Sequence, residues 1–283
     1  MKVNYTIIEI REKIKDWNKQ GLSVGFVPTM GYLHTGHLSL IEAAKRENDK
    51  VVVSIFVNPT QFSPNEDLEK YPRNFEKDKL LCEQNGVDIL FFPTEQEIYP
   101  NKNLINIDIN KLDNNLCGRL RIGHFNGVCL IVLKLFNIIK PTNAYFGKKD
   151  FQQLQIIKNM VKDFNIDINI IGMPIIREKN GLALSSRNSY LSKEEFEDAS
   201  IINKSLQKAK YSLENGETDI KKIISNIENS ILQKLTAKID YIEIVDTKNL
   251  QKVDKIDCEV LISVAVFIGK TRLIDNIVIQ NNM

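Results

Sequence analysis

Two of the three histidines of this 283-residue chain lie three residues apart, in the stretch PTMGYLHTGH at residues 28–37. The apolar run SVGFV precedes this stretch and the helix-like run LSLIEAAKR follows it, so His34 and His37 fall at an expected helix start. Free backbone N–H groups and the helix dipole favour an anion at such a position. Two imidazole donors there suit a polyphosphate, and suit still better the charge that develops when a phosphorus atom is attacked.

Two other interpretations of the histidine pair remain open at this level. A His-x-x-His pair can bind a metal, although no third Cys, His or carboxylate ligand accompanies it nearby. The pair can also be a polar helix cap without function. The sequence contains neither G-x-x-x-x-G-K-[ST] nor G-x-G-x-x-G, so a phosphate site here would use histidines in place of a lysine-bearing loop.

Polar side chains that could join this site occur in four further segments: SIFVNPTQF (54–62), RIGHFNGV (121–128), YFGKKDFQQLQ (145–155) and GLALSSRNSYLS (181–192). Taken singly each is a weak signal, because amides and hydroxyls in turns mostly satisfy backbone groups. The first three follow expected strands or begin expected helices. Since the carboxyl ends of parallel strands meet at one sheet edge, these segments could converge with the histidines there.

Strands and helices alternate over the first 171 residues. Buried strands are predicted at 23–27, 51–57, 88–92, 144–146 and 167–171, and helices at 7–17, 38–46, 73–85, 127–140 and 150–164. This alternation predicts an α/β fold with a Rossmann-like parallel sheet and helices on both of its faces.

The pattern changes near residue 180. Two long polar helices are predicted near 193–214 and 218–235, followed by strands at 241–245, 259–267 and 272–279. A short turn with Gly269 and Lys270 joins the last two strands and indicates a hairpin. We therefore expect a Rossmann-like domain over residues 1–177 and a smaller C-terminal α+β domain over 178–283.

Composition excludes several classes of function. The chain is 43% hydrophobic and 26% charged with a net charge of +2, and its charges are mixed in sign, so no nucleic-acid partner is expected. No apolar run reaches the roughly 20 residues that span a bilayer. Charges interrupt the N-terminal segment throughout, which argues against a signal peptide and favours a cytoplasmic protein.

The segments PTMGYLHTGH, FVNPTQF, FGKKDFQQL and LALSSRNSYL, in this order, resemble the motifs of the pantoate–β-alanine ligases, or pantothenate synthetases. His-x-Gly-His alone is typical of the wider superfamily of nucleotidyltransferases and class I aminoacyl-tRNA synthetases. The resemblance implies an ATP-dependent ligase of the coenzyme A pathway. Pantoate would attack the α-phosphorus of ATP to give pantoyl adenylate and pyrophosphate, and β-alanine would then displace AMP to give pantothenate.

Site residues follow from the resemblance motif by motif. It implies His34, His37, Lys149 and Arg187 as catalytic, with His37 as the candidate proton donor. The implied ATP-binding residues are Met30, Gly31, Tyr32, Leu33, His34, Thr35, Gly36, His37, Gly147, Lys148, Lys149, Asp150, Ile176, Leu184, Ser185, Ser186 and Arg187.

The acid substrates would be held by amides. Gln61 and Gln153 would bind pantoate, with Asn58 and Arg121 in support, and Gln61 would also bind β-alanine. Mg²⁺ is expected to accompany ATP, held mainly by phosphate oxygens and water, with Asp78 as a candidate ligand. The resemblance also suggests a homodimer formed through the N-terminal domain.

Two positions depart from the family pattern. Lys148 stands where an acidic residue is usual and Ile122 where proline is common; the first could alter ATP affinity and the second could loosen the loop that carries Arg121. Two alternatives also stay open: another nucleotidyltransferase, which would not need the Gln61 and Gln153 pair, and a nucleotide-binding regulatory protein without turnover.

Overall fold

The computed structural model describes residues 1–63 and 66–280, which form two compact units. The first unit comprises Met1–Ile109, Arg121–Lys148 and Ile156–Pro174. The second comprises Asn110–Leu120, Lys149–Gln155 and the chain from Ile175 onward. The boundary expected between residues 177 and 178 stays a prediction.

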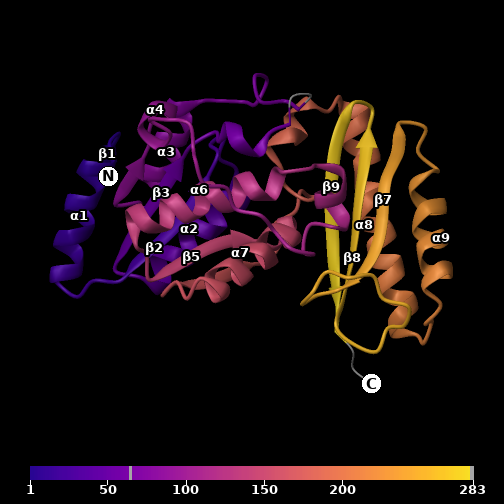
Figure 1. Cartoon of the computed structure of the whole chain (residues 1–283). Helices are drawn as coiled ribbons and strands as arrows, with labels where there is room; N and C mark the ends of the chain where they lie inside the picture. Colours follow the sequence, from indigo (N-terminus) through magenta and orange to yellow (C-terminus); the bar gives the residue numbers. More distant parts are fainter. Residues whose placement is uncertain (64–65, 281–283) are drawn as a thin grey trace. The chain divides into compact units, whose positions relative to one another are not determined.

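A six-stranded, all-parallel sheet forms the centre of the first unit (Figure 1). Its order is β1-β4-β3-β2-β5-β6, with β1 (Lys2–Asn4), β2 (Val24–Thr29), β3 (Lys50–Ile55), β4 (Ile89–Phe91), β5 (Asn143–Gly147) and β6 (Asn169–Met173). The β-branched run at residues 51–53 is fully buried, as expected for a parallel strand covered on both faces.

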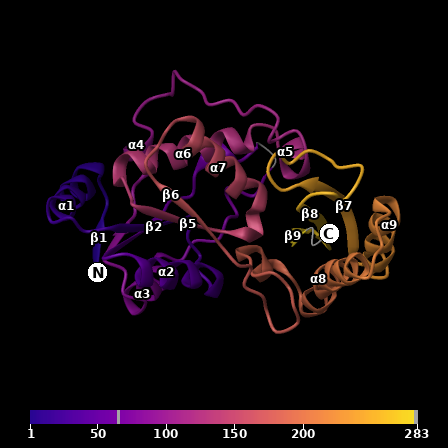
Figure 2. The same ribbon diagram turned by 90° about the horizontal axis from the view of Figure 1, so that it is seen from below.

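Helices cover both faces of this sheet (Figure 2). Helices α2 (Thr35–Glu47) and α3 (Phe75–Gln84) lie on one face, and α6 (His124–Ile139) and α7 (Phe151–Asp163) lie on the other. Helix α1 (Ile7–Lys19) packs beside α6, and the short α4 (Glu95–Ile98) follows β4. The predicted Rossmann-like α/β fold is confirmed.

The strand order reverses at the centre of the sheet. From β2 the chain proceeds to β3 and β4 on one side, and it later returns to place β5 and β6 on the other side. Ligands of open α/β sheets bind at such a switch point, beyond the carboxyl ends of the strands. Residues that directly follow β2 and β5 therefore occupy the position where a ligand is expected.

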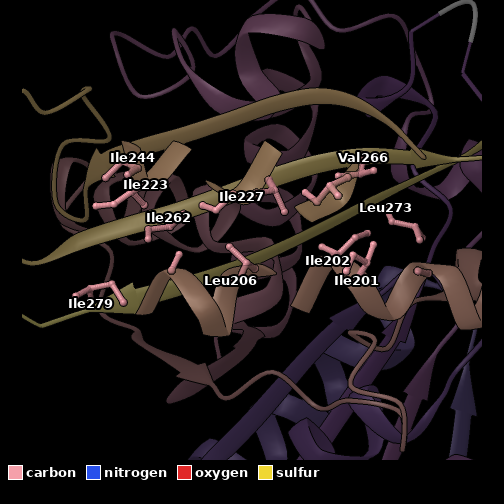
Figure 3. Packing of buried hydrophobic residues seen from close by; sticks show 14 of the residues in the cluster. Ile201, Ile202, Leu206, Ile223, Ile227, Ile244, Ile262, Val266, Leu273 and Ile279 are labelled. Carbon is pink, nitrogen blue, oxygen red and sulfur yellow. The ribbon is translucent and has the colours of Figure 1, made fainter. Parts of the chain in front are cut away.

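The second unit is built around an antiparallel sheet in the order β7-β8-β9, with β7 (Ala237–Asp246), β8 (Val260–Ile268) and β9 (Thr271–Ile279). Helices α8 (Lys193–Glu214) and α9 (Ile220–Ile231) pack on it through an aliphatic core that includes Ile202, Leu206, Ile227 and Val266 (Figure 3). The short α5 (Leu116–Leu120) also belongs to this unit. The predicted α+β architecture and the β8–β9 hairpin are confirmed.

Within residues 1–63 and 66–280, no helix is both long enough and apolar enough to cross a membrane.

Candidate active site

The two histidines cap helix α2 in a reciprocal manner. Strand β2 ends at Thr29, and His34 is the N-cap of the helix that begins at Thr35. The Nδ1 atom of His34 accepts the Gly36 N–H at 3.2 Å, and the Nδ1 atom of His37 accepts the His34 N–H at 3.3 Å. Backbone donors at the helix start are thereby satisfied by imidazole nitrogens.

This cap fixes how the rings can act. A neutral imidazole whose Nδ1 accepts a hydrogen bond carries its proton on Nε2, so His34 and His37 each have an Nε2–H donor. The ring centroids lie 4.1 Å apart, which places the two donors together at the switch point. The capping interpretation of the pair is correct, and it is compatible with a role toward an anion.

The loop between β2 and α2 turns sharply because two consecutive residues adopt left-handed backbone conformations. Gly31 has φ of 85° and Tyr32 has φ of 52°. A Cβ atom at Gly31 would lie 3.0 Å from Cγ2 of Ile55 and 3.1 Å from Oδ2 of Asp78. Glycine is required here both by the backbone conformation and by the close packing.

Asp78 of α3 holds the loop between β2 and α2 in place. Its carboxylate accepts the N–H groups of Tyr32 and Leu33, each at 2.7 Å, and its side chain is almost fully buried. Burial raises the pKa of the Asp78 carboxyl above its usual value, although the two amide bonds work to lower it. The contact joins residues more than 40 positions apart, and nothing in the sequence indicated it.

These bonds bear on the expected Mg²⁺ ligand. Both Asp78 oxygens are engaged by the loop, and the described part of the chain contains no group of three or more His, Cys, Asp or Glu side chains able to hold a metal. A resident Mg²⁺ site made of protein ligands does not fit these residues. An ion that arrives on the phosphates of a nucleotide would need none.

Gln61 and Asn58 form a buried amide pair after β3. The Asn58 Oδ1 accepts from the Tyr99 hydroxyl at 2.9 Å, and its Nδ2 donates to the Gly127 carbonyl at 3.1 Å and to Oε1 of Gln61 at 3.0 Å. With Oε1 engaged in this way, the Gln61 amide directs its Nε2 end at Met30, whose sulfur lies 3.3 Å away. The structure thus brings Gln61 against the loop that carries the histidines.

Helix α6 supports this turn at close range. A Cβ atom at Gly127 would lie 2.2 Å from the Thr60 carbonyl oxygen, so only glycine permits the approach of the helix to the 3₁₀ turn Pro59–Gln61. The missing side chain therefore helps to place the Gln61 amide.

Arg121 is held by an acidic partner. Its guanidinium forms two bonds with the Glu66 carboxylate, at 2.7 and 2.6 Å, and lies 2.9 Å from His124 Nε2. Burial works to raise the pKa of Glu66, but the bonds and charge of Arg121 outweigh it and lower that pKa. His124 Nδ1 contacts the Gln61 carbonyl at 2.7 Å. Arg121 and His124 thus support the Gln61 turn, and the neighbouring Ile122 is 89% exposed.

In the second unit, two adjacent glutamines have different surroundings. Gln152 is buried, and its amide bonds the backbone of Leu112, Asn115 and Gly118. Gln153 is half-buried one position later on α7. The sequence could not distinguish these roles, since both residues lie at the start of the same helix. Gln152 anchors the 110–120 segment.

The remaining second-unit residues come together in two short segments. Lys149 and Asp150 lie in a 3₁₀ turn before α7, with their charged atoms 3.8 Å apart. Ile176 and Leu184 face each other across a turn, where the Leu184 N–H donates to the Ile176 carbonyl at 3.0 Å. Ser185 then caps the 3₁₀ helix Ser186–Tyr190, which contains Arg187.

The fold is a doubly wound α/β sheet with a His-x-Gly-His helix start at its switch point, where a phosphate-bearing ligand is expected. The buried amide pair of Asn58 and Gln61 lies beside that helix start. The chain belongs to the pantoate-β-alanine ligase family, whose sequence profile matches residues 2–278.

Curated relatives and solved structures agree with this assignment over nearly the whole chain. The chain is 54% identical over 276 residues to a pantothenate synthetase of Clostridium botulinum (strain Loch Maree / Type A3), covering 98% of each. It is 56% identical over 271 residues to that of Enterococcus faecalis (strain ATCC 700802 / V583), covering 96% of each.

Two crystal structures show the same architecture. The pantothenate synthetase of Thermus thermophilus superposes with a TM-score of 0.91 at 38% identity, covering 98% of this chain and 99% of that one. The pantoate-β-alanine ligase of Francisella tularensis, complexed with β,γ-ATP and β-alanine, superposes with a TM-score of 0.82 at 41% identity, covering 98% and 97%.

Proposed function

We propose that this protein condenses pantoate with β-alanine at the expense of ATP, through an enzyme-bound pantoyl adenylate. Family membership supports the overall reaction. The observation that carries the assignment within the nucleotidyltransferase class is the contact of Gln61 with Met30. It puts an amide suited to a hydroxy acid beside the loop suited to phosphates.

The reaction has two steps. A carboxylate oxygen of pantoate attacks the α-phosphorus of ATP; the new O–P bond forms as the bond to the β-phosphate oxygen breaks, and pyrophosphate leaves. The neutral amine of β-alanine then attacks the acyl carbon, AMP departs with the bridging oxygen, and the amine proton passes to solvent. Neither step needs a protein nucleophile, so the residues act by positioning and by stabilising phosphate charge.

Histidines and cations carry the first step. The Nε2–H groups of His34 and His37 donate hydrogen bonds to phosphate oxygens, and His37, the candidate proton donor, donates its hydrogen bond to the oxygen on which charge develops as pyrophosphate leaves. Lys149 and Arg187 neutralise charge that develops on the leaving pyrophosphate. The other residues proposed to bind ATP are Met30, Gly31, Tyr32, Leu33, Thr35, Gly36, Gly147, Lys148, Asp150, Ile176, Leu184, Ser185 and Ser186.

Gln61 and Gln153 hold pantoate, and Gln61 also contacts β-alanine. Because Asn58 occupies Oε1 of Gln61, the Nε2 donor is the end of the Gln61 amide available to a substrate oxygen. Asn58 and Arg121 act through Gln61, by fixing its amide and its backbone. Mg²⁺ enters bound to ATP, as part of the substrate complex, and Asp78 braces the loop instead of serving as its principal ligand.

One assay distinguishes this function from its alternatives. AMP and pyrophosphate formation are measured with pantoate, with β-alanine, with both and with neither. Pyrophosphate release that requires pantoate, and steady AMP formation that requires both acids, is the expected pattern. Transfer of a nucleotidyl group to a phosphorylated acceptor, or ATP binding without turnover, would refute the proposal.

Truncation of the two glutamine side chains proposed to bind pantoate should raise the KM for pantoate and leave ATP binding near normal. Gln61→Ala and Gln153→Ala each leave a polar substrate group unpaired, at a cost of about 1–3 kcal/mol. Gln152→Ala is the matched control, because its amide bonds the backbone of Leu112, Asn115 and Gly118; it should lower stability without a selective rise in the KM for pantoate. Weaker ATP binding with unchanged pantoate affinity in the first two variants would refute the assignment.

Removal of the loop brace should weaken ATP binding at a distance. In Asp78→Asn an amide N–H₂ would face a backbone N–H, which we expect to cost about 1–3 kcal/mol of folding stability and to raise the Kd for ATP. Asp88→Asn is the control, since Asp88 accepts the Val51 N–H at the opposite end of the sheet. Calorimetric titration of ATP against both variants makes the comparison; equal ATP affinity would show that the brace does not shape the site.

We also propose a cytoplasmic homodimer. The similarity of the chain to the family over residues 2–278 supports this. Sedimentation analysis of the purified protein tests the assembly directly, and a monomer at micromolar concentration would contradict it.

A further inference from the structure

Strand β9 carries two consecutive buried polar side chains, Asp275 and Asn276, in the otherwise apolar stretch LIDNIVI at residues 273–279. Asp275 is 2% exposed and Asn276 is 5% exposed. A buried carboxylate and a buried amide are both costly unless they are hydrogen-bonded. Their partners therefore show what these residues hold in place.

Asn276 reaches the 3₁₀ turn before α7. Its Nδ2 donates to the Lys149 carbonyl at 2.8 Å. The bond fixes the backbone of the residue whose ammonium group is proposed to meet the phosphates. Its donor comes from a regular strand of the sheet, whereas its acceptor lies in a short turn.

Asp275 contacts the turn at residues 177–184, which leads to Ser185 and Arg187. Its carboxylate forms a bidentate pair with Arg177, at 2.6 and 3.0 Å, and Arg177 also donates to the Gly181 carbonyl at 3.1 Å. Arg177 pairs with Ala183 in an isolated β-bridge. The turn between Arg177 and Ala183 is followed by Leu184, which lies directly before Ser185 and the 3₁₀ helix that contains Arg187.

We propose that Asp275 and Asn276 are positioning residues: from one strand, β9, they hold in place both second-unit segments proposed to bind ATP, the turn that contains Lys149 and the segment 184–187. Asn276 fixes the position of the Lys149 backbone, and Asp275 fixes the position of the 184–187 segment through its ion pair with Arg177. The inference rests on the proposed function, because it requires those segments to bind ATP. Neither residue need touch the nucleotide, and neither is expected to affect the binding of the acid substrates.

The variants Asn276→Ala, Asn276→Asp and Asp275→Asn test this inference in the full-length protein. Asn276→Asp keeps the side-chain volume but removes the donor, and it carries the measurement if the alanine variant does not fold. Asp240→Asn is the matched control. It breaks a second Arg–Asp pair on the same sheet, with Arg272 at 2.9 Å; Arg272 also contacts Cys117 and Tyr241, which lie outside both segments.

The expected result is a selective loss of affinity for ATP. Each test variant should raise the KM and the Kd for ATP by about fivefold to twentyfold, the scale of one lost buried hydrogen bond, with the KM for pantoate unchanged within about twofold. Attack of β-alanine on preformed pantoyl adenylate should keep its wild-type rate. In Asp240→Asn the thermal midpoint should fall while the KM for ATP does not change.

Two outcomes overturn the inference and are distinguishable. The first outcome has wild-type enzyme that forms AMP in a pantoate-dependent manner. If the test variants then show a wild-type KM and Kd for ATP, or lose activity toward all substrates equally as Asp240→Asn does, the positioning role alone is refuted. Wild-type enzyme that forms no pantoate-dependent pyrophosphate refutes the proposed function, and this inference with it.

Discussion

Replacing His37 with alanine is expected to lower kcat by about 10²-fold or more, the scale of losing one preorganised donor to developing charge. The ring Nε2–H is the group that would meet the phosphates, because Nδ1 is occupied by the His34 N–H. The KM for pantoate should change little, since Gln61 and Gln153 are the residues proposed to hold that substrate. Single-turnover formation of pyrophosphate, with the fold checked by circular dichroism, measures the effect.

Two further variants separate the capping role of His37 from its chemistry. Asparagine places Oδ1 where Nδ1 of histidine lies, so His37→Asn retains an acceptor for the helix cap but has no group at Nε2. Glutamine instead places an N–H₂ group near the Nε2 position. We expect His37→Asn to be as inactive as His37→Ala, and His37→Gln to recover part of the lost rate. Activity of His37→Asn within a few-fold of wild type would remove the ring from the mechanism.

Replacing Arg187 with alanine should slow adenylate formation by about 10-fold to 10³-fold, because the cation proposed to offset pyrophosphate charge is lost. The second step should be spared, since the triphosphate has gone by the time β-alanine attacks. Rapid-quench measurement of pyrophosphate release, and separately of pantothenate formation from preformed pantoyl adenylate, gives the two rates.

Arg187→Lys provides the graded comparison for this prediction. It retains the charge but loses the planar fork of donors, so an intermediate rate for the first step is expected. Equal slowing of both steps in Arg187→Ala would instead indicate that Arg187 organises the second unit as a whole. That result would contradict its assignment to the phosphates.

The parts of the site that could be predicted from sequence are those set by local signals. The start of α2 follows from an apolar strand, a polar loop and an amphipathic run, so His34 and His37 were correctly placed at its N-terminus. The strands of the parallel sheet were visible because buried β-branched runs have few alternative structures. Strand β1 was missed because three residues are too few to display a period.

The supports of the site could not be predicted, because they join residues far apart in the chain. Asp78 bonds the Tyr32 and Leu33 amides, and Glu66 pairs with Arg121 across more than 50 positions. Acidic residues in helices, such as Asp78, and in loops, such as Glu66, are normally solvated, so the sequence does not distinguish these two carboxylates from their neighbours. Nothing in the sequence indicated that the 110–120 segment belongs to the second unit.

Similarity to a family and physical reading contribute different things at Gln61. The resemblance assigns this residue to pantoate and β-alanine. The structure adds the orientation of its amide, because Asn58 is itself oriented by the Gly127 carbonyl and the Tyr99 hydroxyl. The direction of the Gln61 donor toward Met30 is therefore a property of the fold around Gln61 and not of the residue type.

The central claim is that activation of pantoate proceeds through an acyl adenylate, and the fate of a carboxylate oxygen tests it most directly. Pantoate labelled with ¹⁸O in its carboxylate is incubated with ATP, Mg²⁺ and enzyme, first alone and then with β-alanine. Without β-alanine we expect about one equivalent of enzyme-bound pantoyl adenylate per site, followed by slow turnover, because exclusion of water protects the intermediate. After β-alanine is added, one ¹⁸O atom should appear in the phosphate of AMP. Label recovered in inorganic phosphate, with ADP as the nucleotide product, would mean acyl-phosphate chemistry and would contradict the account.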